Sequence, residues 1–501
     1  MYPYKSTFNN NLGVGSMNKF TLIAMIGLIV GNAAVAADVD VTENITTSQL
    51  WTADNVYHLK AVIYVEPGAS LTIQPGTLIR GNTASALVVA NGAQIFAMGT
   101  KNRPIIMTSE EDDLVTWRPS CEEWGNLTIM GDALISATLD GDGIGAPTGL
   151  DIAQMEGLEA RFPGDTLPLY GGGDDDDDSG VISYVSLRYG GHVLSIANEL
   201  NGMSLGGVGR GTDMDHVEIM NNVDDGIEIW GGTLNIKYVS IWNIGDDSFD
   251  LDQGYRGKAQ FGLIVQGYCG DNSQGSGIGD NCFEMDGAED ATAQPFGTAL
   301  IYNFTTVGQP YDGDQGTEWR DNMRAQFHNC VFMDIGDKMV KDGGTGGDGG
   351  GYGSAGVPAL DWLFTRSYDD YPTNIASVDP KALYPNFTSG TWCQFTDCVF
   401  HNLSETDSLD TYGVMAEANN NTISDLSPIQ AITRAEPEVV GGKAMALVTY
   451  LNPRAANDAA SSVDMAPDDG FFTPAPYAGA FGPDENWLVG WTAASAYGMT
   501  D

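Results

Sequence analysis

Two neighbouring stretches decide the fold, HVEIMNNVDDGIEIW at residues 216–230 and YVSIWNIGDDSFDLD at residues 238–252. When one is shifted by 22 residues onto the other, Val, Ile, Asn and both Asp residues coincide. Apolar residues alternate with other residues at the start of each stretch, as in a strand with one buried face. A repeat of this length built from short strands is typical of a parallel β-helix, in which each coil stacks on the one before it.

The rest of the chain supports the same architecture. ASLTIQPGTLIRG (69–81) and SALVVANGAQIFAMGT (85–100) are short apolar runs divided by turn residues, and CVF occurs at 330–332 and again at 398–400. A two-sheet sandwich is the alternative, but it favours strands spaced by about 8–12 residues. We therefore predict an all-β fold, a right-handed parallel β-helix (solenoid) with loop insertions and capped ends.

Three segments are expected along the chain. Residues 1–36 form an N-terminal extension and a signal peptide, with a start at Met17, an apolar run from Phe20 to Val30 and a small-residue cleavage motif. The alternative, a transmembrane anchor, requires a longer apolar run. Residues 37–430 form the β-helix, with segment 42–60 covering one end and insertions at about 140–180, 265–295 and 340–392. Residues 431–501 form a last coil and an aromatic, Gly-rich segment packed on the helix.

Six cysteines in an exported chain favour disulfides. Cys269 and Cys282 flank the loop CGDNSQGSGIGDNC and are the predicted pair, because a covalent link would order a loop with few apolar residues. Cys393 pairs locally with Cys398, or Cys398 meets Cys330 on a neighbouring coil, and both alternatives stay open. Metal binding by the thiols is disfavoured because no two-residue Cys spacing occurs.

The charge balance excludes some functions. The 67 acidic and 22 basic residues leave a net charge of −45, which repels nucleic acid phosphates, so no nucleic acid partner is expected. Hydrophobic residues make up 42% of the chain, enough for a folded core. The 64 glycines, together with many Asp residues, indicate a turn-rich β protein surrounded by cations.

Dense aspartates at the turns predict calcium sites, because calcium takes six to eight oxygen ligands. In stacked coils Asp224–Asp225 and Asp246–Asp247 would lie about 4.8 Å apart, which demands a cation or protonation. A solvated acidic face is the alternative. The predicted ligands of several calcium ions are Asp140, Asp142, Asp174, Asp175, Asp176, Asp177, Asp178, Asp224, Asp225, Asp246, Asp247, Asp250, Asp252, Asp286, Asp312 and Asp314.

The paired aspartates also resemble those of polygalacturonase-type glycosidases, in which Asp residues protonate the leaving group and activate water. That pattern is incomplete here, because the single Gly-His (191–192) precedes the Asp pairs and the Arg-Gly-Lys at 256–258 sits in the next turn. A lyase mechanism needs an arginine facing the calcium, a role for Arg256 or Arg188. His328 and His401 resemble strand positions. We therefore expect no catalytic residue and no enzyme.

Several stretches together resemble a family of secreted right-handed β-helix proteins of marine gammaproteobacteria, which includes square-lattice surface-layer (S-layer) proteins. The stretches that carry the resemblance are LWTADNVYHLKAVIYVEPGASLTIQPGTLIRG (50–81), YGGGDDDDDSGVISYVSLRYGG (170–191), NNVDDGIEIWGG (221–232), GDDSFDLDQGYRGKAQF (245–261) and AFGPDENWLVGWTAASAYG (480–498).

This resemblance implies a structural, calcium-dependent and self-assembling S-layer subunit at the outer face of the outer membrane, also shed extracellularly. Its expected partners are copies of itself in a two-dimensional lattice and outer-membrane lipopolysaccharide held through divalent cations, and no transmembrane span is expected. A polysaccharide-active β-helix enzyme and a glycan-binding adhesin are the alternatives.

Overall fold

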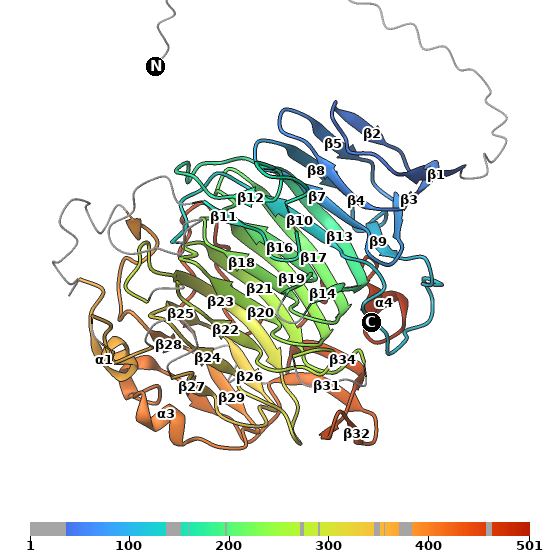
Figure 1. Cartoon of the computed structure of the whole chain (residues 1–501). Helices are drawn as coiled ribbons and strands as arrows, with labels where there is room; N and C mark the ends of the chain where they lie inside the picture. Colours follow the sequence, from blue (N-terminus) through green and yellow to red (C-terminus); the bar gives the residue numbers. More distant parts are fainter. Residues whose placement is uncertain are drawn as a thin grey trace, which may run out of the picture. The chain divides into compact units, whose positions relative to one another are not determined.

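A computed structural model describes residues 37–136, 152–158, 160–195, 198–270, 275–288, 291–344, 351–354, 356–369, 383–456 and 463–501. The predicted signal peptide and two predicted calcium ligands, Asp140 and Asp142, lie outside these residues. The fold is a parallel β-helix, as the 22-residue repeat predicts, and its strands stack coil upon coil (Figure 1).

Most described strands belong to two parallel sheets. The larger sheet contains β1 (Ala37–Val41), β2 (Gln49–Trp51), β3 (Asn55–Leu59), β5 (Ser70–Ile73), β6 (Leu78–Gly81), β8 (Gln94–Met98), β9 (Ile105–Ser109), β13 (Gly180–Gly190), β17 (Asp213–Asn222), β19 (Asn235–Ile244), β21 (Lys258–Val265), β23 (Thr298–Val307), β25 (Arg324–His328), β26 (Val331–Met333), β28 (Gln394–Thr396), β29 (Val399–His401) and β30 (Thr422–Ile423). The smaller sheet contains β4 (Val62–Val65), β7 (Ala86–Val89), β10 (Leu127–Met130), β16 (Met203–Gly206), β18 (Ile227–Trp230), β20 (Phe249–Asp252), β22 (Phe283–Met285), β24 (Thr317–Trp319) and β27 (Val340–Asp342).

The register between neighbouring coils follows the repeat in the sequence. Val217 pairs with Val239 between β17 and β19, and Ile227 pairs with Phe249 between β18 and β20. Side chains such as that of Ile227 point into the common core, whereas every second residue points outward. Gly226 fits between the coils because a Cβ atom there would lie 2.3 Å from the carbonyl oxygen of Ser248.

The long strands of the larger sheet bend at two residues with left-handed backbone geometry. The first is His216 in β17 and Tyr238 in β19, with φ of 50° and 55°, and the second is Asn221 and Asn243, with φ of 61° and 54°; the register between the two strands is interrupted at both. The first bend places one ring above the next, with centroids 4.1 Å apart for Tyr184 and His216 and 4.4 Å apart for His216 and Tyr238. Each bent strand therefore takes part in two adjoining stacks of strands within the larger sheet.

The N-terminal segment differs from the prediction that residues 42–60 cover one end. β1 pairs with β3, and β2 pairs with β5, all in parallel. These residues thus begin the solenoid instead of covering it, because their alternating side chains continue the core of the following coils. Near the last strands lie the short helices α1 (Leu360–Thr365), α3 (Asp407–Thr411) and η1 (Glu417–Asn419), and α3 packs on β27.

The remaining strands form four antiparallel pairs. β11 (Ala153–Gln154) and β12 (Leu169–Tyr170) belong to a segment whose apolar side chains pack on the outer face of the smaller sheet. β14 (Val193–Ser195) pairs with β15 (Asn198–Glu199), and β32 (Glu438–Val440) pairs with β33 (Lys443–Met445). β31 (Ile429–Arg434) pairs antiparallel with β34 (Val448–Ala455), so this region is not the last coil that we expected.

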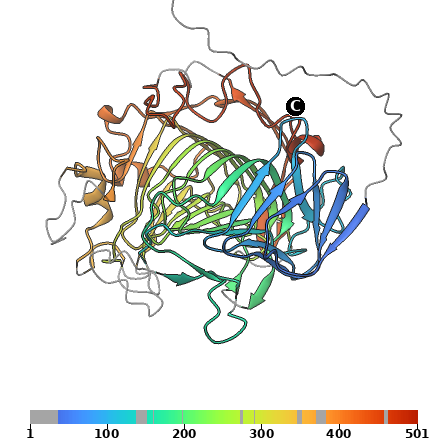
Figure 2. The ribbon, with the colours of Figure 1, turned by 90° about the horizontal axis from the view of Figure 1, so that it is seen from above.

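The C-terminal segment from residue 463 onward, drawn in red, runs along the side of the coils, where it ends in α4 (Ala493–Ala496) (Figure 2). Trp487 and Trp491 pack against the stacked rings of the larger sheet, at 5.5 Å from Tyr238 and Tyr184 respectively. The buried carboxylate of Glu218 accepts hydrogen bonds from the backbone N–H groups of Ala493 and Ala494. Through these contacts the aromatic C-terminal segment packs on the larger sheet.

The predicted Cys269–Cys282 disulfide is wrong. Cys269 pairs with Cys121, 148 residues earlier, with 5.6 Å between the two Cα atoms. Cys282 is a free, buried cysteine that directly precedes β22 and points into the core, whereas Cys269 lies in the loop that follows β21. The two residues are close in sequence, but the side chain of Cys282 lies in the core of the solenoid, whereas Cys269 lies in a loop outside it.

Candidate metal centre

A column of acidic side chains lies on the outer face of the smaller sheet. The parallel register aligns Ser204, Glu228, Asp250, Glu284, Glu318 and Lys341 on successive strands from β16 to β27. Residues on either side of each position point into the core, so these side chains face outward. Glu228 and Asp250 are nevertheless buried, with 8% and 5% of their surface exposed.

A second set of carboxylates lies at the turns that lead into the same strands. The backbone N–H of Asp225 donates to the side chain of Asn201 (3.1 Å), and the N–H of Asp247 donates to Asp225 Oδ1 (2.9 Å). The N–H of Asn281 donates to Asp247 Oδ1 (2.6 Å). Each side chain thus accepts a hydrogen bond from the following coil, which fixes the carboxylates of Asp225 and Asp247 in the stack.

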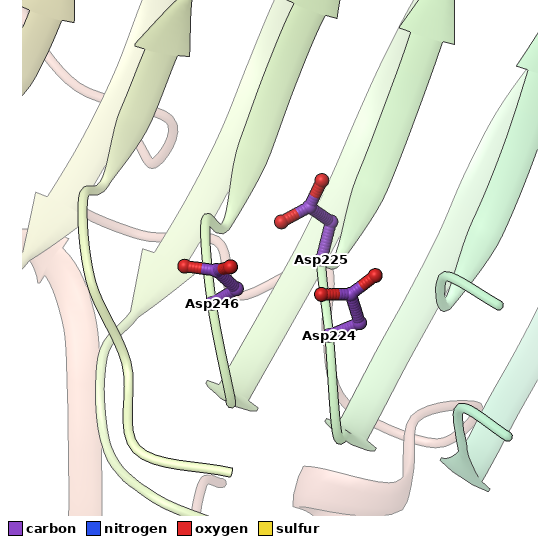
Figure 3. A group of neighbouring side chains, drawn as sticks. All are labelled: Asp224, Asp225 and Asp246. Carbon is purple, nitrogen blue, oxygen red and sulfur yellow. The ribbon is translucent and has the colours of Figure 1, made fainter. Parts of the chain in front are cut away.

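Two groups of carboxylates are close enough to share a cation. Asp224, Asp225 and Asp246 offer oxygen atoms within 4.8 Å of one another, and so do Asp225, Glu228 and Asp250. Figure 3 shows the first group, with two aspartates on one turn and Asp246 on the neighbouring turn. Asp225 belongs to both groups, and carboxylate oxygens are the ligands that hard cations such as calcium prefer. These buried acidic clusters could bind metal ions.

The electrostatics of the clusters disfavour the charged form of every member that is buried. Burial, and then the nearby carboxylates, raise the pKa values of Asp225, Glu228, Asp247 and Asp250 well above the ordinary range. Asp250 Oδ1 is a buried oxygen with no hydrogen-bond partner among the described residues. A buried polar atom without a partner costs free energy unless a ligand satisfies it.

The C-terminal half of the column carries its own positive charges. Arg320 lies 2.6 Å from Glu284 and 3.5 Å from Asp286, and Lys341 lies 2.8 Å from Glu318. Among the described residues, no ion pair joins a Lys or an Arg to Asp225, Glu228 or Asp250. Arg320 acts on Asp250 without forming an ion pair with it, so the region around Asp225 is the better candidate for a metal site.

The predicted run Asp174–Asp178 lies apart from these two groups and serves several partners. Asp175 lies 2.7 Å from the guanidinium of buried Arg256, and Asp176 lies 2.6 Å from Arg210. Oxygens of Asp174, Asp177 and Asp178 accept backbone N–H groups at 3.0, 3.4 and 2.9 Å. The Arg256 ion pair keeps the pKa of Asp175 below its ordinary value.

The other predicted ligands also lie outside the two groups of carboxylates and contact other partners. Asp252 accepts the backbone N–H of Gln253, and Asp286 lies near Arg320. Asp312 accepts the backbone N–H of Ala444 (2.8 Å) and Asp314 pairs with Lys443, so these two hold the β32–β33 hairpin. The structure therefore brings together Asp224, Asp225, Asp246 and Asp250 from the predicted set, beside Asp247.

The residues considered for an enzyme mechanism have structural contacts. Arg188 is buried, donates to Ser186 and lies 3.7 Å from Asp112. Arg256 is engaged with Asp175 and with the carbonyl oxygen of Leu134. His328 lies in β25 and His401 in β29, as their sequence context predicts, and burial lowers the pKa of His328 to about 4.

Sequence reasoning missed Glu228, and it missed Glu284 and Glu318 together with their basic partners. Glu228 aligns with Asp250 in the 22-residue repeat, so the repeat itself contained the signal. The sequence separation between the next aligned residues of the column is larger, because loops are inserted before β22 and β24. A fixed period therefore does not reach Glu284 or Glu318.

The fold and this column define a parallel β-helix protein with a buried carboxylate cluster suited to cations. The chain belongs to the family described as the pectate-lyase-like β-helix domain, which matches residues 43–346. No curated protein and no solved structure matches the sequence. In the part of the chain that the structure describes, none of the helices has the length and hydrophobicity that a membrane-spanning helix requires.

Proposed function

We propose that this protein is a structural protein of the cell surface, a calcium-dependent S-layer subunit that assembles with copies of itself and catalyses no reaction. Lipopolysaccharide beneath the lattice binds through divalent cations. The proposal combines the resemblance of the sequence, described above, with the chemistry of the acidic cluster. The Cys121–Cys269 disulfide supports an oxidising location outside the cytoplasm.

One observation carries the structural role: the paired aspartates are built into the wall of the solenoid. Asp225 and Asp247 are buried, with 8% and 5% of their surface exposed, and both accept backbone hydrogen bonds from the next coil. A general acid or base must reach the reacting group of its substrate. Carboxylates held in this way are better placed to bind a small cation than to contact a polysaccharide.

Calcium suits both the cluster and the charge of the whole chain. The cluster supplies only oxygen ligands, and extracellular calcium at millimolar concentration fills weak sites. Copies with a net charge of −45 repel one another unless cations bridge or screen them. Heterologous contacts between such copies extend into an open array instead of a closed oligomer.

Electron microscopy of the purified chain with and without calcium tests the proposal. We expect two-dimensional arrays in millimolar calcium and dispersed particles after treatment with a chelator. Particles that remain monomeric in calcium would contradict the lattice. In cells, a chelator should release the protein from the surface, and retention in millimolar EDTA would contradict cation-dependent attachment.

The family gives a reason to test a second function, a polysaccharide lyase or glycosidase. The experiment is incubation with a panel of acidic and neutral polysaccharides, followed by measurement of reducing ends and unsaturated uronates. Activity that disappears in the Asp246→Asn, Asp247→Asn double variant while the fold is retained would assign catalysis to this turn. An inactive protein across the panel fits the structural proposal.

A groove on the larger sheet favours the third function, glycan binding. It has a volume of about 710 Å³, and its lining combines apolar Met98 and Phe471 with polar Asp213, Asn235 and Lys237. Saturable binding to glycan arrays by a protein that stays monomeric in calcium would support an adhesin over a lattice subunit.

A further inference from the structure

Two free cysteines occupy equivalent positions on neighbouring coils. Cys330 directly precedes β26, Cys398 directly precedes β29, and Val331 pairs with Val399 in parallel register. The backbone N–H of Val399 donates to the carbonyl oxygen of Cys330 (2.8 Å). Stacked parallel strands lie about 4.8 Å apart, and disulfides typically join Cα atoms about 4.4–6.8 Å apart.

The side chains of Cys330 and Cys398 point into the same core. Cys330 and Cys398 both belong to the core cluster and both are almost fully buried, and burial followed by the neighbouring Cys330 thiol raises the pKa of Cys398. Cys330 Sγ also contacts the carbonyl oxygen of His328 (3.2 Å), and Cys398 Sγ contacts that of Thr396 (3.4 Å). The backbone therefore already holds the two sulfur atoms side by side.

The local alternative, a Cys393–Cys398 pair, does not fit the fold. Cys393 precedes β28 and Cys398 precedes β29, and these two strands belong to different columns of the larger sheet, stacked on β25 and β26 respectively. Cys282 lies on the smaller sheet, directly before β22. Within the described residues, register thus favours Cys330 as the partner of Cys398.

We propose that Cys330 and Cys398 form a second disulfide of this protein in an oxidising compartment. The two thiols transfer two electrons and two protons to a small-molecule or enzyme disulfide, which is reduced to two thiols, and one S–S bond forms between the cysteines. Both thiols are buried in the folded chain, so the exchange takes place before the coil that carries Cys398 docks on its neighbour.

The bond would connect the family-matched part of the chain to the coil that follows it. Cys330 lies inside residues 43–346 and Cys398 lies beyond them, with α1 between the two. Closing a long loop restricts the unfolded chain and stabilises the folded one. The link is independent of calcium and of lattice assembly.

Peptide mapping tests the proposal directly. The full-length chain is refolded with oxidised and reduced glutathione, unfolded without reductant, alkylated, and digested with trypsin and an Asp-directed protease. The second protease is needed because Asp397 separates Cys393 from Cys398. We expect fragments 325–333 and 397–406 to appear joined by a disulfide, and the number of alkylated cysteines to fall from four to two.

Matched variants separate the link from a folding defect. Cys393→Ser should retain the joined fragments, whereas Cys398→Ser should release Cys330 for alkylation and leave the Cys121–Cys269 link intact. Recovery of alkylated Cys330 and alkylated Cys398 from the folded wild-type chain would overturn the proposal. A link between Cys393 and Cys398 would overturn it as well.

Discussion

The two halves of the acidic column meet the same electrostatic problem in different ways. In the half nearer the C-terminus, Glu284 and Glu318 lie beside Arg320 and Lys341, at 2.6 and 2.8 Å. In the other half, Asp225, Glu228 and Asp250 cluster without an ion pair to a described Lys or Arg, and Asp250 Oδ1 has no hydrogen-bond partner within the described parts of the chain. Both halves have the same backbone arrangement, a stack of parallel strands.

The difference shows what a carboxylate on a solenoid wall requires. Burial makes an isolated charge expensive, and a like charge on the next coil adds repulsion. One half pairs Glu284 and Glu318 with basic side chains of the same chain, so its stability should depend less on added ions. The other half must hold protons or bind cations, so its stability should depend on both.

Removal of divalent cations should have the largest effect. A site that is saturated a hundredfold above its Kd stabilises the folded state by about 2.7 kcal/mol. We expect EDTA to lower the melting temperature, and hydrogen exchange should rise in residues 217–252 more than in residues 317–333. Equal exchange in both regions would remove the distinction between the two halves.

The Arg320→Met substitution should convert the self-neutralised half into a cation-dependent one. It leaves Glu284 and Asp286 without their positive partner, at a cost of about 2–3 kcal/mol. The figure lies below that for a fully buried pair because the Arg320 side chain is 29% exposed. Urea unfolding measures the loss, and Lys101→Met, at an exposed position, should change stability by less than about 0.5 kcal/mol.

The effect of the Asp250→Asn substitution on stability should have opposite signs in the absence and in the presence of divalent cations. Without divalent cations it replaces a carboxyl group whose charged form the fold disfavours with a neutral amide, and it should stabilise the chain by about 1 kcal/mol at neutral pH. In calcium it removes a ligand and should reduce the calcium-induced rise in melting temperature. Glu318→Gln is the control in the other half, and its effect should be the same with and without calcium.

The smallest effect concerns pH in the absence of divalent cations. The raised pKa values of Asp225, Glu228, Asp247 and Asp250 mean that the folded chain binds protons more tightly than the unfolded chain. Their contribution is complete below the ordinary carboxyl pKa of about 4 and is lost as the pH rises through the folded values. In EDTA the melting temperature should therefore fall as the pH rises above the ordinary carboxyl pKa of about 4, and calcium should flatten this dependence.

Much of the fold followed from local pattern. The 22-residue repeat placed Val217 on Val239 and the Asp224–Asp225 turn beside Asp246, and the register confirms both. The prediction failed where pairing is not local. The partner of Cys269 lies 148 residues away, and the segment after β30 turns back as an antiparallel pair.

The sequence by itself determined the parallel β-helix, the stacked aspartates and the excess of negative charge, because a repeat of strands fixes which residues lie above one another. Only the tertiary structure decided which carboxylates lack a basic partner. Lys341 lies one coil after Glu318, but Arg320 and Lys443 lie 36 and 129 residues from Glu284 and Asp314, and Arg256 lies 81 residues from Asp175. The balance of charge at each coil depends on these long-range contacts, and no period in the sequence encodes them.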